Sequence, residues 1–228
     1  MAKRTFRVNQ ELLAKARRVL GARTDLYLVL GGSCAGKSTI CRIISEKMGM
    51  AIYDMDSHIY ESYMGRYSVQ RHPANKSWFS APNPLAWALS LTAEQFNGLN
   101  RATTAEYLDL LADDLADREP EALLIDGGFT HPSLLVEVFA PRNLFCIETI
   151  AADRISIWEN AEDRGMMRQW IRDLPNPDEM WHKFLLFDGV IADTLATESR
   201  AHSVPTVLRD REMSADELAD LAMQALAI

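Results

Sequence analysis

The stretch GGSCAGKST, residues 31–39, combines the residue types that proteins use to bind nucleotide phosphates. Gly31, four further residues, Gly36, Lys37 and Ser38 match the phosphate-binding loop pattern in full. Glycines let the backbone turn its N–H groups toward anionic oxygens, the lysine reaches the outer phosphates, and the serine hydroxyl is a ligand for Mg²⁺. We therefore predict a phosphate site; the alternative is a glycine-rich structural turn. The predicted phosphate-binding residues are Gly31, Gly32, Ser33, Cys34, Ala35, Gly36, Lys37, Ser38 and Thr39.

Three aspartates follow short apolar stretches that have the composition of buried strands. Asp54 and Asp56 lie in YDMDSHIY, and Asp126 ends the run ALLID. Residues two apart in an extended chain share a face, so Asp54 and Asp56 are expected on the same side. Asp126 is expected to hold the water shell of a bound Mg²⁺ or to bind a second substrate. The alternatives are structural, with Asp56 as the N-cap of the following helix and Asp126 as the start of a turn.

Arginines recur with helical spacing in the segment DRISIWENAEDRGMMRQWIRD. Arg164, Arg168 and Arg172 are four residues apart, so one face of a helix would present three guanidinium groups. Such a face can neutralise negative charge on a phosphate. The alternative is an ordinary surface helix with salt bridges, because acidic residues are close in the sequence. The remaining residues of this pattern are Arg154, Glu159, Glu162, Asp163 and Asp173.

The elements that must position these residues alternate between strands and helices, which predicts a parallel sheet covered on both faces. In such sheets ligands bind beyond the carboxyl ends of the strands, where the loop and the aspartates fall. Ser214 and Glu217 form a capping box for a last helix. Strands are expected at 26–30, 51–54, 122–126, 144–147 and 204–208, and helices at 36–48, from 57, at 101–117, at 151–172 with a break at Gly165, and from 214.

Composition and charge narrow the possible partners. The chain has 228 residues with 48% hydrophobic residues and a net charge of −8. Residues 1–24 carry a balance of +6 and are expected to form a basic amphipathic helix, so the rest carries about −14. An acidic body argues against a nucleic acid partner, and no apolar run is long enough to cross a membrane. Three scattered cysteines indicate neither a disulfide framework nor a zinc site, and a reducing cytoplasm is the expected setting.

The strand followed by GGSCAGKST, the acids of YDMDSHIY and the strand end LLIDGG resemble the small P-loop kinases. These include adenylate-type nucleotide kinases, shikimate and gluconate kinases, and chloramphenicol phosphotransferase, which GGSxAGKS resembles most. The resemblance covers about residues 25–210. It implies a three-layer α/β P-loop kinase domain over 25–228, with Mg²⁺ and ATP as the phosphate donor. It also implies a lid at 151–175 and an acceptor-binding insertion at 65–100.

The resemblance also implies roles for single residues. Lys37 contacts the transferred phosphate, Asp56 contacts the acceptor hydroxyl as general base, and Asp54 helps to hold Mg²⁺ through water. Asp126 belongs to the same metal site or binds the acceptor, and Arg164 and Arg168 close over the phosphate. The motif GGFT resembles the DGF of adenylate-type kinases with one extra glycine, which leaves the role of Phe129 open.

The expected activity is phosphoryl transfer to a hydroxyl or phosphate of a small molecule, with a ring-bearing metabolite, an antibiotic or a nucleoside-like acceptor favoured. The alternatives are a nucleoside monophosphate kinase, a nucleotide-binding switch or ATPase without an acceptor, and a P-loop scaffold that binds nucleotide structurally. Residues 65–92, with three prolines and several aromatic residues, are expected to be irregular. The predicted acceptor-binding residues are Asp56, His58, Arg66, Arg71 and Asp126, with aromatic neighbours Tyr60, Tyr63, Trp78, Phe79 and Trp87 and the further histidine His72.

Overall fold

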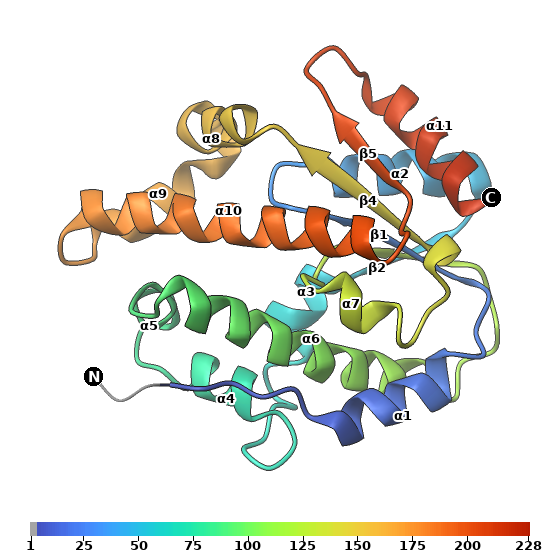
Figure 1. The fold of residues 1–228 in the computed structure, drawn as a ribbon, viewed down its shortest axis with the longest axis horizontal. Coiled ribbons are helices and arrows are strands. Elements are labelled where there is room, and N and C mark those ends of the chain that lie inside the picture. The colour runs from blue at the N-terminus through green and yellow to red at the C-terminus, as the bar shows by residue number, and fades with distance from the viewer. Residues whose placement is uncertain (1–3) are drawn as a thin grey trace.

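A parallel β-sheet forms the centre of the molecule in a computed structural model that describes residues 4–228 (Figure 1). The strand order is β2-β3-β1-β4-β5, and every pair of neighbouring strands is parallel. This confirms the predicted fold class, a five-stranded α/β sheet with helices on both faces. The strands are β1 (Leu26–Gly31), β2 (Ala51–Asp54), β3 (Leu123–Asp126), β4 (Leu144–Thr149) and β5 (Thr206–Arg209).

Two hydrophobic layers cover the sheet because its central strands are apolar on both faces. On one face, Val29 and Phe145 pack with residues of α2 (Lys37–Met48) and α11 (Ala215–Leu226). On the other face, Leu28 and Cys146 pack with residues of α6 (Ala93–Leu115), α7 (Pro132–Leu135) and α10 (Pro177–Ala201). The long helices α6 and α10 run side by side beneath the sheet (Figure 1). The predicted capping box of Ser214 and Glu217 is present at α11.

A third group of buried apolar residues lies away from the sheet, between α5 (Pro84–Leu89), α6, α8 (Ala151–Asn160), α9 (Gly165–Arg172) and α10. Its members include Leu89, Leu99, Trp158 and Phe187. The carboxyl ends of the strands point toward this group of helices (Figure 1). Whatever binds beyond the strands therefore meets an apolar surface built by helices.

The region between β2 and β3 is more helical than the sequence predicted. The chain forms α3 (Met55–Ser57), the π-helical turn η1 (His58–Ser62), α4 (Pro73–Phe79) and α5, so the expected irregular insertion is wrong. Pro73 and Pro84 each stand at the first position of a short helix, where the missing N–H costs nothing. Helix α6 starts at Ala93, eight residues before the predicted start, because Thr92 and Gln95 form a capping box.

The lid region departs from the expected single break at Gly165. Helix α8 ends at Ala161, whose ψ of 129° is extended, and Gly165 instead begins α9 with helical angles. The short 3₁₀ turn η3 (Glu162–Arg164) joins the two helices, and a second 3₁₀ turn, η2 (Pro141–Asn143), precedes β4. Arg164 and Arg168 therefore do not lie on one continuous helical face.

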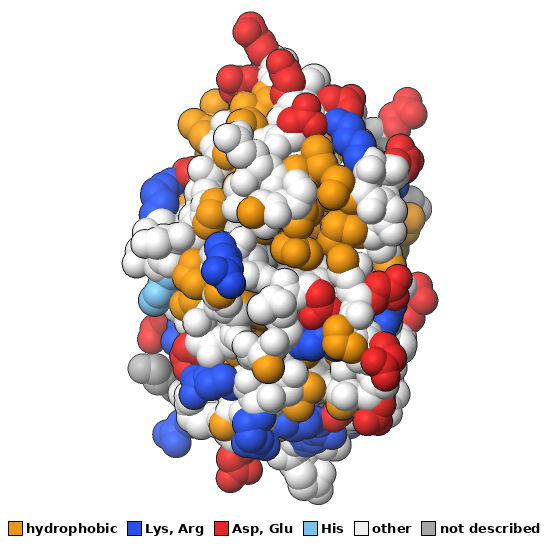
Figure 2. Space-filling view, turned by 90° about the vertical axis from the view of Figure 1, so that its right-hand side faces the viewer, with side chains coloured by type: hydrophobic (Ala, Val, Ile, Leu, Met, Phe, Trp, Pro, Cys, Tyr) orange, Lys and Arg blue, Asp and Glu red, His pale blue; other side chains and the backbone are white. Residues whose placement is uncertain are grey.

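The basic N-terminal segment forms helix α1 (Gln10–Leu20), which packs along α6. Leu12, Leu13, Ala16 and Leu20 are buried, which confirms the amphipathic pattern, while Met1–Lys3 lie outside the described residues. Figure 2 shows Lys and Arg side chains gathered at the lower end of one face, the end at which α1 lies. Within residues 4–228, no helix has both the length and the hydropathy needed to span a membrane.

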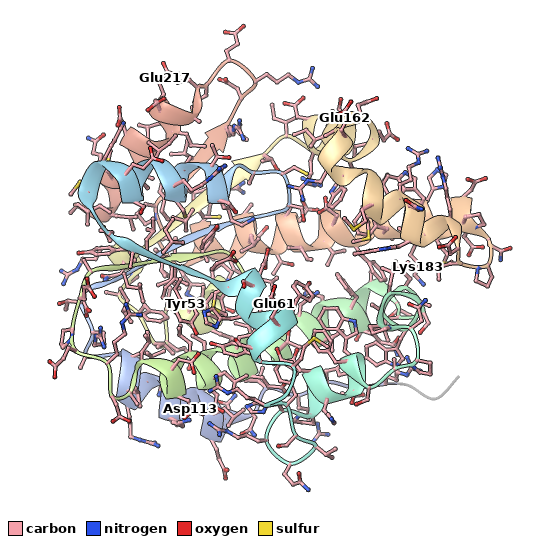
Figure 3. The ribbon with its side chains drawn as sticks, turned by 180° about the vertical axis from the view of Figure 1, so that it is seen from behind. Tyr53, Glu61, Asp113, Glu162, Lys183 and Glu217 are labelled. Carbon is pink, nitrogen blue, oxygen red and sulfur yellow. The ribbon has the colours of Figure 1, made fainter. Side chains whose placement is uncertain are left out.

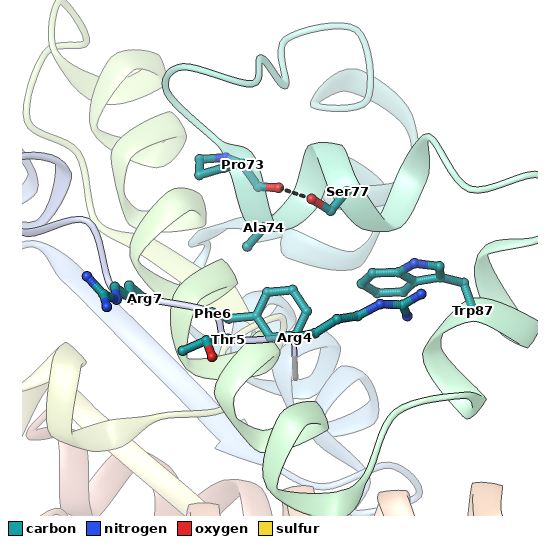
Figure 4. Close-up of a pocket in the computed structure, with 8 residues that line it drawn as sticks. All are labelled: Arg4, Thr5, Phe6, Arg7, Pro73, Ala74, Ser77 and Trp87. Carbon is teal, nitrogen blue, oxygen red and sulfur yellow. Dashed lines mark hydrogen bonds between the residues drawn. The ribbon is translucent and has the colours of Figure 1, made fainter. Parts of the chain in front are cut away.

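The residues before α1 cover α4 and α5. Phe6 contacts the Trp87 ring edge-on with centroids 6.0 Å apart, and the Arg4 guanidinium lies 5.0 Å from the same ring. A cavity of about 530 Å³ remains between this segment and Pro73, Ala74 and Ser77 (Figure 4). The segment thus packs against both short helices.

Candidate functional site

The phosphate loop follows β1 and closes onto the first turn of α2. Gly36 is the N-cap of α2 with φ 91°, a left-handed conformation that favours glycine. A Cβ at this position would lie 2.5 Å from Arg209 Nη1, so a side chain here would displace the Arg209 guanidinium. The loop is therefore shaped by its own sequence and by a cation from β5.

Two cationic side chains donate hydrogen bonds to carbonyl groups of the loop. Lys37 Nζ donates to the Gly32 carbonyl at 2.9 Å, which folds this side chain back over the loop. Arg209 Nη1 donates to the Ala35 carbonyl at 3.0 Å. The sequence analysis missed Arg209, although its place at the carboxyl end of the last strand was a usable signal.

Asp126 and Asp54 meet at the carboxyl edge of the sheet, since they are register partners on β3 and β2. Asp126 is buried, and its Oδ1 has no hydrogen-bond partner among the described residues. Burial raises the pKa of Asp126, while the Ser38 hydroxyl and the Lys37 ammonium oppose that rise. Asp54 accepts a hydrogen bond from the Ser57 N–H at 3.1 Å and is the N-cap of α3. Asp56, for which an N-cap role was the structural alternative, does not have that role.

Asp56 lies in the first turn of α3, so the expected extended geometry of Asp54 and Asp56 is wrong. Asp56 lines a cleft; desolvation raises the pKa of its carboxyl group, and the charges of Lys37 and Arg164 oppose that rise. Asp54 and Asp126 add to the rise, because carboxylates disfavour each other's charge. The charges of Lys37 in the phosphate loop and of Arg164 therefore both act on the Asp56 carboxyl group.

The cleft has a volume of about 400 Å³ and extends from the phosphate loop between α6 and α10. The loop contributes Gly31, Ser33 and Lys37 to its wall. The other lining residues are Asp56, Ile59, Tyr60, Trp78, Leu85, Ala88, Leu89, Phe96, Leu99, Asn100, Thr103, Tyr107, Gly128, Phe129, Thr130, Trp158, Arg164, Met167, Phe184, Phe187, Asp188, Ile191 and Leu195.

The two glycines of GGFT, Gly127 and Gly128, lie close to Lys37 and Met55. Gly128 has φ 76°, and a Cβ there would lie 2.4 Å from Met55 Cβ. A Cβ at Gly127 would lie 3.0 Å from Lys37 Cε. The extra glycine lets the chain pass between α3 and the phosphate loop, which places Phe129, almost fully buried, in the wall of the cleft.

The structure separates the predicted lid arginines. Arg164 lines the cleft, with its guanidinium 5.3 Å from the centroid of the Trp158 ring. Arg168 is not among the described lining residues; its guanidinium lies 4.9 Å from the centroid of the Trp181 ring. A lid role for Arg168 stays a prediction that this geometry does not support.

A buried ion pair that the sequence did not predict joins α8 to α10 beside the phosphate loop. Arg154 Nε donates to Asp188 Oδ2 at 2.6 Å, and both side chains are 4% exposed. Burial raises the pKa of Asp188, while Arg154 and the Ser33 hydroxyl lower it. A single acid inside the apolar run FLLFDGVI was the available signal.

The cations predicted to bind the acceptor lie elsewhere. Arg66 Nη1 lies 2.6 Å from Asp114 Oδ1, and Arg71 Nη2 lies 2.5 Å from Asp113 Oδ2, so both arginines pair with acids of α6. Asp113 lies where α6 runs beside α1 (Figure 3). The His58 ring stacks on Tyr53 at 3.9 Å and is not among the described lining residues. The structure therefore does not bring His58, Arg66 or Arg71 to the cleft.

Among the described residues, no group of three or more His, Cys, Asp or Glu side chains is arranged to hold a metal ion. Mg²⁺ commonly binds through one or two carboxylates, water and substrate phosphates instead of a full protein cage. The residues present fit that mode, because Asp126 offers an unpartnered buried oxygen beside Ser38 and Asp54.

No protein-family model matches this chain, and no curated protein matches it. Among solved structures, the chain is similar to a gluconokinase from Sinorhizobium meliloti 1021, at 16% sequence identity and a TM-score of 0.43. The match covers 90% of this chain and 93% of the gluconokinase chain.

Proposed function

We propose that this protein transfers the γ-phosphoryl group of ATP to a hydroxyl group of a small molecule. One observation carries the proposal: a phosphate loop opens into a cleft that continues well beyond it, with Asp56 and Arg164 at the junction. Cavities of about 300–1,000 Å³ are typical of small-molecule sites, and this cleft of about 400 Å³ falls in that range. A second substrate therefore has a place next to the donor phosphate.

The chemical step is a displacement at the γ-phosphorus. The acceptor oxygen forms a new bond to that phosphorus, and the bond to the oxygen shared with the β-phosphate breaks. The hydroxyl proton passes to the Asp56 carboxylate and then to solvent, leaving ADP and a phosphate monoester. Lys37 stabilises the charge on the phosphate oxygens, and Arg164, which also lines the cleft, adds positive charge.

Asp126, Ser38 and Asp54 would hold Mg²⁺, which neutralises phosphate charge when it is bound. Asp126 would contribute its buried oxygen, Ser38 its hydroxyl and Asp54 an oxygen reached through water. Asp54 retains an oxygen for this purpose, because only Oδ1 accepts the α3 cap hydrogen bond.

A nucleotide switch or ATPase without an acceptor is the second candidate, since the phosphate loop alone serves either function. The cleft between α6 and α10 favours the kinase, because hydrolysis needs room only for water. The test is incubation with Mg·ATP and a pool of small metabolites, followed by mass spectrometry for products heavier by one phosphoryl group. Nucleotide hydrolysis with no phosphorylated product across alcohols and nucleosides would favour the switch.

A further inference from the structure

Helix α10 contacts the phosphate loop through two residues that are one turn apart. The Ser33 hydroxyl of the loop acts on the Asp188 carboxyl group as a hydrogen-bond donor. A Cβ added at Gly32 would lie 3.2 Å from the Cβ of Ala192. Residues four apart share one face of a helix, so a single face of α10 packs against the first half of the loop.

Asp188 is the charged residue of this face, and Arg154 of α8 holds it. Arg154 Nε donates to Asp188 Oδ2 at 2.6 Å, and the side chain of each residue is 4% exposed. Arg154 Nη1 also donates to Thr149 Oγ1, at the end of β4, at 3.4 Å. Burial raises the pKa of Asp188, while the charge of Arg154 and the Ser33 hydroxyl oppose that rise. The carboxylate therefore lies between an anchored guanidinium and the loop.

The next residue of the loop has a conformation that needs support from its surroundings. Cys34 has φ 64°, in the left-handed region that is unfavourable for a residue with a Cβ. Such a conformation persists where the surrounding structure holds it. The two residues before Cys34 are the ones that α10 contacts, Gly32 and Ser33. Helix α10 is therefore placed to hold the turn of backbone that directs the loop N–H groups toward phosphates.

Stability alone does not account for the pair of Arg154 and Asp188. Apolar residues of similar volume often replace a buried ion pair with little change in stability. A second buried acid, Asp109 of α6, offers a comparison: it is fully buried and pairs with Arg71 and His72. Asp109 is not among the described residues that line the cleft, whereas Asp188 lines it beside the loop.

We propose that Asp188 is a positioning residue for the phosphate loop: anchored by Arg154, it orients the Ser33 hydroxyl and with it the backbone that binds the nucleotide phosphates. This inference rests on the proposed function. Asp188 acts through Ser33 and not through contact with the nucleotide. Because Arg154 neutralises the carboxylate, Asp188 can lie beside the phosphates without repelling them.

The first test replaces both charges together. The pair variant, Arg154→Met with Asp188→Leu, leaves neither a buried cation nor a buried anion without its partner, and thermal unfolding shows whether it is folded. Isothermal titration calorimetry on the full chain measures binding of AMP-PNP, a non-hydrolysable ATP analogue, with Mg²⁺. We expect about tenfold weaker binding, which corresponds to about 1.4 kcal/mol. Wild-type affinity in the folded pair variant overturns the inference.

Ser33→Ala tests whether the effect passes through Ser33. This variant alone should weaken binding of AMP-PNP about tenfold, and the pair substitution should add no further loss in the Ser33→Ala background. Substitutions that act on one contact are non-additive, whereas independent ones add. Additive losses would indicate direct contact of the pair with the nucleotide and overturn the inference. Where the pair variant does not fold, Ser33→Ala decides alone, and wild-type affinity of this variant overturns the inference.

Asp109→Asn is the matched control, because it breaks a buried charged network away from the loop. It should lower the stability of the fold and leave the affinity of the folded protein for AMP-PNP unchanged. An equal loss of affinity in Asp109→Asn and in the pair variant would indicate general destabilisation and overturn the positioning role.

Transfer assays with Mg·ATP separate this inference from the function on which it rests. Weaker AMP-PNP binding in the pair variant, with no phosphorylated product from the wild type, supports the positioning role and removes the phosphotransferase proposal. Phosphorylated product from the wild type, with unchanged affinity in Ser33→Ala and the pair variant, does the reverse. Absence of AMP-PNP binding to the wild type removes both.

Discussion

The two ends of the cleft are built by opposite means. The phosphate end uses backbone groups and charged side chains that follow the strands β1, β2 and β3 along the carboxyl edge of the sheet. The other end, between α6 and α10, is lined by apolar side chains of α5, α6, α8 and α10, helices that are distant in the sequence. Under the proposed function, the contrast means that phosphate binding depends on local sequence, whereas acceptor choice depends on how the helices pack.

Replacing Lys37 should have the largest effect, because it removes the cation predicted to contact the transferred phosphate. Lys37→Ala is expected to lower phosphoryl transfer by about 10³-fold, the upper range for loss of one preorganised charge-stabilising donor. The measurement is turnover under saturating acceptor. Lys47→Ala, at the other end of the same helix and paired with Asp220 at 2.9 Å, is the control. Full activity of Lys37→Ala contradicts the phosphate-loop account.

Asp56→Asn tests the junction between the two ends. Loss of the general base should lower kcat by about 10²-fold or more, while ATP binding survives. Glu61→Gln, an exposed change on η1 (Figure 3), is the control. Loss of folding in Asp56→Asn would instead indicate a structural role, and circular dichroism distinguishes the two outcomes.

Variants of Arg164 and Arg168 compare an arginine that lines the cleft with one that packs outside its described lining. Arg164 lines the cleft near Asp56, so Arg164→Ala should lower kcat about tenfold, a loss of about 1.4 kcal/mol of transition-state stabilisation. Arg168 packs over Trp181, and Arg168→Ala should change kcat little. Steady-state kinetics of the two variants decide between them; equal losses would restore the predicted common lid face.

Replacing Asp109 should have the smallest effect on turnover and a clear effect on the free energy of unfolding. Burial would raise its pKa, but hydrogen bonds from His72, Arg71 and Lys15 outweigh burial and lower it. A carboxyl with a lowered folded pKa stabilises the fold above its unfolded pKa of about 3.9, and that stability is lost as the pH falls. Stability should therefore decline below about pH 4.

A variant without the Asp109 carboxyl group tests this dependence of stability on pH. Asp109→Asn should cost about 3 kcal/mol at neutral pH, because it breaks a buried charged network, and should flatten the loss of stability in acid. Urea unfolding at neutral and acidic pH measures both quantities. Exposed Asp117→Asn is the control, and an identical acid response of wild type and Asp109→Asn would contradict the role of Asp109.

The phosphate end could be predicted from the sequence because its parts are contiguous. One strand, one loop and one helix start lie within residues 26–48, and Asp54 and Asp126 each end a strand. The five strands were predicted for the same reason, since each is a short apolar run. Three features of this end were not predicted: the α3 cap at Asp54, the helical position of Asp56, and the hydrogen bond of Arg209 to the loop.

Contacts between segments that are distant in the sequence could not be predicted. The pair of Arg154 and Asp188 spans 34 positions, and Arg209 reaches Ala35 across 174. Arg66 and Arg71 had the composition of acceptor-binding residues, but their acidic partners on α6 more than 40 positions away hold them elsewhere. Sequence alone showed the cations and the acids without showing which of them pair.

The most direct test of the central claim is phosphorus NMR of a reaction containing the protein, Mg·ATP and a panel of alcohols and nucleosides. We predict a new phosphate monoester resonance that grows as ADP forms and is absent with Lys37→Ala. Formation of ADP with inorganic phosphate as the sole other phosphorus product would contradict the account.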